Sequence, residues 1–227
     1  QLAQLNPKFF SVTFGAGGST RDGTYHMVQE IQAQGFSAAP HISCISSTRT
    51  ELRDLLDAGA LESLEADLQH LPERFHARSA DAVHDLLLRL GDLSRDEIAA
   101  RSESGMAGAA IAELLSTRRA LDVRIAGEPR LIAVEDAARY RDAIGTPLPP
   151  GLPDTLLESV ADPVGDLVRR YSRTHGPFVS QSVSVRLGIG VAVVEAVLAR
   201  LRAAGRVIDG EFRPGGRGRE WCDAEVL

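Results

Sequence analysis

One order of predicted elements occurs twice in this chain, and it constrains the fold more than any other feature. Ser79–Leu90 carries apolar residues at helical spacing, and Gly91 follows it as a typical helix end. Ser94 and Glu97 form a capping-box signature that begins a second helix. The remaining predicted elements are a third helix at Ala109–Thr117, strands at Leu121–Ile125 and Leu131–Val134, and the turn-rich segment Ala126–Arg130 between the strands.

The same order recurs after a proline-rich stretch, Pro147–Pro153. Asp162 is a predicted N-cap with Pro163 at the first helical position, and that helix runs to His175. The following elements are helices at Ser180–Leu187 and Val191–Ala204, strands at Arg206–Phe212 and Arg219–Cys222, and the flexible segment Pro214–Gly218 between the strands.

Three helices followed by a hairpin is the order of a winged helix. The sequence therefore predicts two winged-helix-like modules, at residues 61–146 and 162–227, with residues 147–161 as a rather stiff linker. The two modules share their order of elements and no obvious sequence identity.

The front of the chain, residues 1–57, has a different pattern. Phe9–Phe14 and Ser37–Ile45 are predicted strands, with a predicted helix at Thr24–Gln34 between them and another beginning at Glu51. Strand, helix, strand is a βαβ unit with parallel strands. The glycine loop after the first strand is not a dinucleotide-binding fingerprint, because Thr20 stands where the third glycine belongs.

Charge and lysine content exclude one class of activity. The net charge is -6, but it is unevenly spread: residues 162–227 carry ten arginines and eight acidic residues, whereas residues 61–161 carry eleven arginines and eighteen acidic residues. The first predicted module is therefore acidic and is expected to be mainly structural. Lys8, the one lysine, follows a proline and not a glycine loop, so the chain lacks a Walker A motif for ATP.

Cysteine and histidine usage indicates neither a metal site nor a catalytic group. Cys44 and Cys222 are far apart, and the histidines have no ligand or triad spacing. No apolar run approaches the length of a membrane span and no signal peptide is visible, so we expect a cytoplasmic protein. The sequence does not begin with Met, and we expect it to be a fragment.

Arginines of the second predicted module are the candidate nucleic-acid ligands. A third helix can enter a groove while a glycine- and arginine-rich wing reaches phosphate. The third helix offers little for reading base edges, so binding is expected to be sequence-independent and sensitive to salt. Trp221 is expected to pack in the core. The candidates are Ser180 and Arg186 on the second helix, Arg200 and Arg202 on the third, and Arg213, Arg217 and Arg219 on the wing.

Residues 61–227 resemble the accessory winged-helix region of the large bacterial helicase family called Lhr. The resembling segments are Glu65–Arg74, Asp81–Gly91, Ile132–Ala143 and Asp162–Cys222, including Glu211–Gly216 and Glu220–Asp223. That family couples ATP hydrolysis to unwinding in DNA repair. The resemblance implies that this chain is a DNA-binding accessory part of such a helicase and that it lacks the ATPase motor.

Residues 1–57 resemble an internal piece of methylenetetrahydrofolate reductase, through Pro7–Asp22 and Ala38–Ile45. That family is a TIM barrel that binds FAD, and the resemblance places Thr13 and His41 beside the flavin. Two of eight βα units cannot close a barrel, so we expect no bound cofactor in this chain by itself.

The predicted fold class is thus α+β, with tandem winged-helix-like modules preceded by a short βαβ fragment of TIM-barrel type. Three functions stay open: a nucleic-acid-binding part of an Lhr-type helicase, a flavin-linked reductase piece, or a module that binds other protein domains. The two resemblances meet near Asp57–Leu61.

Overall fold

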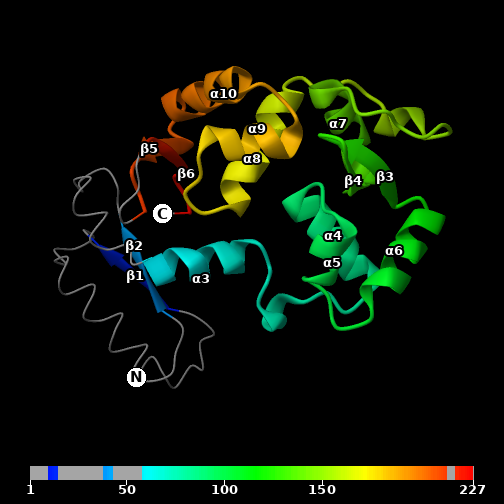
Figure 1. The fold of residues 1–227 in the computed structure, drawn as a ribbon, viewed down its shortest axis with the longest axis horizontal. Helices are drawn as coiled ribbons and strands as arrows, with labels where there is room; N and C mark the ends of the chain where they lie inside the picture. The colour runs from blue at the N-terminus through cyan, green and yellow to red at the C-terminus, as the bar shows by residue number, and fades with distance from the viewer. Residues whose placement is uncertain (1–9, 15–37, 43–57, 214–217, 227) are drawn as a thin grey trace. The chain divides into compact units, whose positions relative to one another are not determined.

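The computed structural model describes residues 10–14, 38–42, 58–213 and 218–226. The chain divides into two compact units, a front unit of residues 1–55 with residue 227 and a back unit of residues 56–226 (Figure 1). Helices and small sheets are both present, which confirms the predicted α+β class. None of the helices in the described part of the chain is long and apolar enough to cross a bilayer.

In the front unit, β1 (Phe10–Phe14) and β2 (Ala38–Ile42) pair in parallel, as predicted. The register sets Thr13 opposite His41. Parallel strands require a crossover connection. The helix predicted in that connection, Thr24–Gln34, and the helix predicted from Glu51 lie outside the described residues.

The back unit begins with α3 (Ala58–Leu68) and the short 3₁₀ helix η2 (Glu73–Phe75). Glu65 of α3 and Gln69, which follows it, contact residues of two distant parts of the back unit. The Gln69 amide donates to the carbonyl of Thr174 at 2.6 Å, and Arg101 donates to the carbonyl of Gln69 at 2.6 Å. The Glu65 carboxylate also accepts a hydrogen bond from the Gly176 amide.

The first module consists of α4 (Ala80–Leu90), α5 (Arg95–Ala99), α6 (Ala107–Ser116), β3 (Ala120–Ile125) and β4 (Glu128–Ala133). Its helices α4 and α5 begin where side chains satisfy the free backbone amides. Ser79 accepts from the Ala82 amide at 3.1 Å, and Ser94 and Glu97 form both hydrogen bonds of the predicted capping box.

The hairpin of the first module is tighter than predicted. β4 begins at Glu128 and not at Leu131, because Ala126 and Gly127 both have positive φ, 52° and 84°, and these two residues alone reverse the chain. Two successive positive φ values are the signature of a two-residue turn that matches the twist of the strands. The hairpin therefore gains three residue pairs, and Pro129 lies opposite Arg124.

The second module consists of α8 (Pro163–Thr174), α9 (Ser180–Leu187), α10 (Val191–Ala203), β5 (Val207–Gly210) and β6 (Glu220–Asp223). Asp162 caps α8 through the Gly165 amide at 3.2 Å, as predicted. β5 ends two residues earlier than predicted, because the amides of Phe212 and Arg213 donate to the Glu220 carboxylate at 2.8 and 3.0 Å.

Both modules close their hairpin in the same way, which the sequence did not predict. The residue between the first and second helices pairs with the returning strand: Leu93 with Leu131, and Phe178 with Trp221. Each pair exchanges two backbone hydrogen bonds, at 3.0 and 2.7 Å in the first module and 2.9 and 2.7 Å in the second. All four side chains are buried, so each bridge fixes a hairpin against its helices.

The connection between the modules contains a helix that the sequence pattern did not predict. The 3₁₀ helix η3 (Val134–Asp136) leads directly into α7 (Ala137–Ile144), which ends at Gly145 with φ of 68°. The proline-rich segment that follows includes the 3₁₀ helix η4 (Asp154–Leu156).

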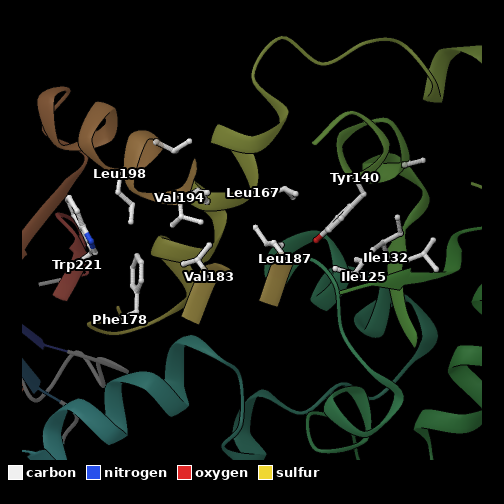
Figure 2. Packing of buried hydrophobic residues seen from close by; sticks show 14 of the residues in the cluster. Ile125, Ile132, Tyr140, Leu167, Phe178, Val183, Leu187, Val194, Leu198 and Trp221 are labelled. Atoms are coloured by element: carbon white, nitrogen blue, oxygen red, sulfur yellow. The ribbon is translucent and has the colours of Figure 1, made fainter. Parts of the chain in front are cut away.

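Two apolar cores share the β3–β4 hairpin. Leu131 and Ala133 belong to the core of the first module, with Val83, Leu87, Ile98 and Leu114. The alternate residues Ile132 and Val134 belong to a second core that also contains Val168, Leu198 and Trp221. Figure 2 shows this second core running from Trp221 and Phe178 through Val183 and Leu187 to Tyr140 and Ile132. The core thus crosses the predicted boundary between the modules.

Candidate nucleic-acid interface

Ser180, predicted to meet a phosphate, lies in the core of the second module. Its side chain is buried, and its hydroxyl accepts from the Trp221 indole at 3.0 Å and donates to Glu195 at 2.7 Å. Trp221 is 1% exposed, which agrees with the expected core role. The Ser180 hydroxyl therefore donates its hydrogen to Glu195 and does not have it free for a phosphate.

Arg186, also predicted as a phosphate ligand, instead joins the two modules. From α9 its guanidinium reaches Asp92 at 2.9 Å and Glu97 at 2.5 Å, both in the first module. Arg130 reaches the same Glu97 at 3.0 Å. Burial would raise the pKa of Glu97, but hydrogen bonds from Arg186 and the Ser94 amide lower that pKa to about 2. Arg186 is thus neutralised by carboxylates of the neighbouring module.

A buried tyrosine extends this junction. The Tyr140 hydroxyl accepts from the Asp92 amide at 2.8 Å and donates to the Asp92 carboxylate at 3.0 Å. Burial raises the pKa of Asp92, and Arg186 and Arg130 oppose that rise. The network is a structural joint between the modules, and its polar atoms face one another.

The predicted arginines of α10 and the wing are exposed but paired. Arg200 bonds Asp162 at 2.7 Å, Arg202 bonds Asp209 at 2.9 Å, and Arg219 bonds Asp209 at 3.1 Å. Arg219 also lies over the Trp221 ring at 4.1 Å. Arg213 bonds Glu220 at 2.7 Å and the Pro177 carbonyl, so it holds the base of the wing. Arg217 lies outside the described residues.

A second group of arginines, which the sequence did not single out, lines a hollow of about 410 Å³. The hollow lies among the end of α4, α7 and α8. Its lining, here called the arginine hollow, is Leu88, Arg89, Arg139, Asp166, Arg169, Arg170, Arg173 and Thr174. The spacing Arg169, Arg170 and Arg173 on one helix was the available sequence signal, since residues three and four apart share a helix face.

Carboxylates fix three of the five arginines in the arginine hollow. The Asp136 carboxylate, 3% exposed, binds Arg170 at 2.9 Å through one oxygen and also pairs with Arg139. Asp166 binds Arg169 at 2.7 Å and Arg139 at 3.3 Å. Arg89 and Arg173 are exposed, and neither side chain has an ion pair or hydrogen bond to any residue that the structure describes.

His175 stacks on Tyr171 with ring centroids 3.7 Å apart, and burial lowers the pKa of His175 to about 4. Within the described ranges, no group of three or more His, Cys, Asp and Glu side chains is arranged to hold a metal ion.

Comparison with known proteins supports both resemblances. Residues 54–159 match the family model of the large helicase-related protein, winged-helix domain, and residues 1–65 match that of methylenetetrahydrofolate reductase. Pieces similar to two families meet in this chain. The matched ranges overlap at residues 54–65, the stretch in which the sequence pattern changes.

Individual relatives come from the same two families. The chain is 46% identical over 179 residues to the Lhr helicase/probable uracil glycosylase of Mycolicibacterium smegmatis, covering 79% of this chain and 12% of the relative. It is 34% identical over 158 residues to the Lhr helicase/uracil glycosylase of Escherichia coli, covering 69% of this chain and 10% of the relative. It is also 35% identical over 154 residues to the 5,10-methylenetetrahydrofolate reductase of Salmonella typhimurium, covering 63% of this chain and 51% of the relative. The chain spans about a tenth of the length of the helicase relatives.

Proposed function

We propose that the back unit consists of two winged-helix modules that bind nucleic acid, as an accessory part of an Lhr-type DNA repair helicase. The observation that carries this proposal is the shared closure of the two hairpins. In both modules the residue after the first helix exchanges two backbone hydrogen bonds with the returning strand. This arrangement is repeated in a chain similar to Lhr helicases.

Binding of this kind is proposed to rest on the phosphate backbone. The outer face of α10 begins with Val191 and Val193, 42% and 48% exposed, which offer no hydrogen bonds to base edges. Arginines are the surface groups suited to phosphate, and contacts to phosphate carry no sequence information. We therefore expect similar affinity for unrelated sequences.

Arg200, Arg202 and Arg219 are proposed as phosphate contacts of the second module. Their side chains are 58%, 57% and 45% exposed; Arg200 is paired with exposed Asp162, and Arg202 and Arg219 share Asp209, which is 22% exposed. An exposed ion pair contributes about 0–1 kcal/mol, so a phosphate can replace the carboxylate at small cost.

We expect no ATP hydrolysis by this chain. A Walker A loop places a lysine after its glycines, and the one lysine of the sequence, Lys8, follows Pro7. An ATPase assay with and without DNA checks this expectation, and DNA-stimulated phosphate release would contradict it.

The test of nucleic-acid binding is fluorescence anisotropy of labelled single-stranded and duplex DNA with the whole chain. For about three phosphate contacts, affinity falls about 40-fold when salt is raised from about 50 to about 200 mM. Two unrelated sequences of equal length serve as the specificity control. An absence of binding at low salt contradicts the proposal and favours a module that binds protein domains.

The second candidate function is a flavin-linked reductase piece in the front unit. One observation favours it, the register of the two paired strands. Thr13 and His41, the residues that the reductase resemblance places beside FAD, are opposite each other on the parallel strands β1 and β2. The described part of the front unit holds these two strands alone, which cannot enclose a flavin. We therefore propose no cofactor for this chain by itself. A yellow chromophore in the purified protein would contradict this.

A further inference from the structure

We propose that the arginine hollow binds phosphates of a nucleic-acid backbone, and that Arg89 and Arg173 are the groups that contact them. This inference rests on the proposed function and adds to its contact surface the face lined by α4, α7 and α8. Its basis is one observation. Among the arginines that the structure describes, Arg89 and Arg173 are the two with no ion pair or hydrogen bond to a described residue, and both line the same hollow.

The charge of the arginine hollow favours an anion. Its lining contains five arginines and one carboxylate, that of Asp166. Asp136 lies buried against Arg139 and Arg170. The two carboxylates leave three positive charges uncompensated. Guanidinium groups bind phosphate through pairs of parallel hydrogen bonds, a geometry that a halide cannot match.

The hollow is also held in shape. Buried Asp136 fixes Arg139 and Arg170, so part of the positive lining is already in place before a ligand arrives. The backbone at Gly91 packs closely against Tyr140 and Arg170. A Cβ atom added there would lie 2.7 Å from the Tyr140 hydroxyl and 3.3 Å from the Arg170 Cδ. A volume of about 410 Å³ is more than ten times the ~30 Å³ share of one water, which leaves room for a phosphodiester.

A second hollow continues the same surface, and this indicates a chain of phosphates and not one isolated anion. Arg169 and Arg173 line both hollows, and the second, of about 360 Å³, adds Arg206. Asp223 and Glu225 also line it, and Glu225 approaches Arg206 at 4.0 Å. Positive groups therefore extend from the end of α4 across α8 to the start of β5.

Helix ends give a simpler account of the two arginines, but an incomplete one. Arg89 and Arg173 each lie in the last turn of a helix, where a cation complements the helix dipole. That account explains each residue singly. It does not explain why three further arginines from α7 and α8 line the same hollow.

The experiment compares the whole chain with two variants of equal charge. In R89Q/R173Q the two unpaired arginines are replaced, and in the control R74Q/R78Q two exposed arginines outside the hollow, paired with Asp67 and Glu103, are replaced. DNA affinity is measured by anisotropy at several salt concentrations, and circular dichroism confirms that all three proteins fold. We expect R89Q/R173Q to lose about tenfold or more in affinity at low salt and about two units of salt slope, with the control close to the unmodified chain.

The outcomes separate this inference from the proposed function. If all three proteins bind DNA equally, the inference is overturned and the proposed function stands. If the unmodified chain does not bind DNA, both are overturned. A parallel measurement by ³¹P NMR line broadening uses inorganic phosphate as the probe. If R89Q/R173Q loses phosphate binding but keeps its DNA affinity, the hollow binds a free anion and the assignment to nucleic acid is overturned.

Discussion

Arg186 of α9 and Glu97 of α5 form a two-point ion pair across the two modules, with contacts of 2.5 and 3.1 Å. Their side chains are 23% and 31% exposed. Such a pair adds little to the free energy of unfolding compared with apolar packing. Removing one partner is costly, because the remaining charge stays partly buried.

Replacing Arg186 with Ala is therefore expected to destabilise the back unit by about 2–3 kcal/mol, since buried Asp92 and partly buried Glu97 would lose one of the two arginines that they share. The measurement is urea unfolding followed by circular dichroism. Arg200→Ala is the control, because its pair with Asp162 is exposed on both sides and contributes about 0–1 kcal/mol. Equal losses in the two variants would contradict a joint at Arg186.

The shared hairpin predicts that both modules unfold together. Leu114 is fully buried in the core of the first module, and Leu114→Ala is expected to cost about 2–5 kcal/mol. Trp221, the one tryptophan of the chain, lies in the second module, so its fluorescence reports that module alone. We expect Leu114→Ala to lower the urea midpoint seen by Trp221 as much as the midpoint seen by circular dichroism. An unchanged Trp221 midpoint would show independent modules.

Gly91 is expected to be intolerant of a side chain. Its φ is +90°, and a Cβ would lie 2.7 Å from the Tyr140 hydroxyl. Gly91→Ala therefore combines backbone strain with a collision and should cost about 2–4 kcal/mol. Gly105→Ala is the matched control, because Gly105 also has positive φ, +79°, but a Cβ added there would have no neighbouring atom within 4 Å. It should cost about 1 kcal/mol, and equal costs would argue against the close approach.

The partly buried imidazole of His175 predicts a pH dependence of stability. Burial lowers the pKa of His175 from 6.5 to about 4. Below pH 6.5 the unfolded chain therefore takes up a proton that the folded chain refuses until about pH 4, and stability falls as the pH is lowered through this window. The loss between pH 7 and pH 5 is expected to be about 2 kcal/mol.

The check for His175 is urea unfolding at pH 7 and pH 5, with His175→Phe as the comparison. Phenylalanine can keep the stack on Tyr171, which has ring centroids 3.7 Å apart in this protein, but it cannot be protonated. The variant should lose less stability than the unmodified chain between the two pH values. The same loss in both proteins would place the pH dependence elsewhere.

Local features of the sequence predicted local features of the fold. Capping side chains at Ser79, Ser94 and Asp162 fixed three helix starts, and glycines marked the ends after Leu90 and Leu187. Helix α7 was missed because its eight residues are mostly polar or small and follow a strand without a cap signal. The bridges at Leu93 and Phe178 were missed because a single extended residue cannot show the apolar–polar alternation that identifies a strand.

The predicted binding residues depended on contacts that are distant in sequence. Arg186 and Ser180 looked available, yet Glu97 lies 89 positions from Arg186 and Trp221 lies 41 positions from Ser180. The arginine hollow was missed for the same reason, since it combines α4, α7 and α8. Arginine type and helical spacing indicate charge, but only the folded chain shows which charges are already neutralised.

A hairpin buried on both faces also decides which piece of this chain can be exchanged by recombination. Leu131 faces one core and Ile132 the other, so a gene segment carrying either module alone would leave an apolar strand face against water. We therefore expect the two modules to be inherited together. The overlap of the two family matches, at residues 54–65, precedes Ala77, the first residue of either core, so a join there divides neither core.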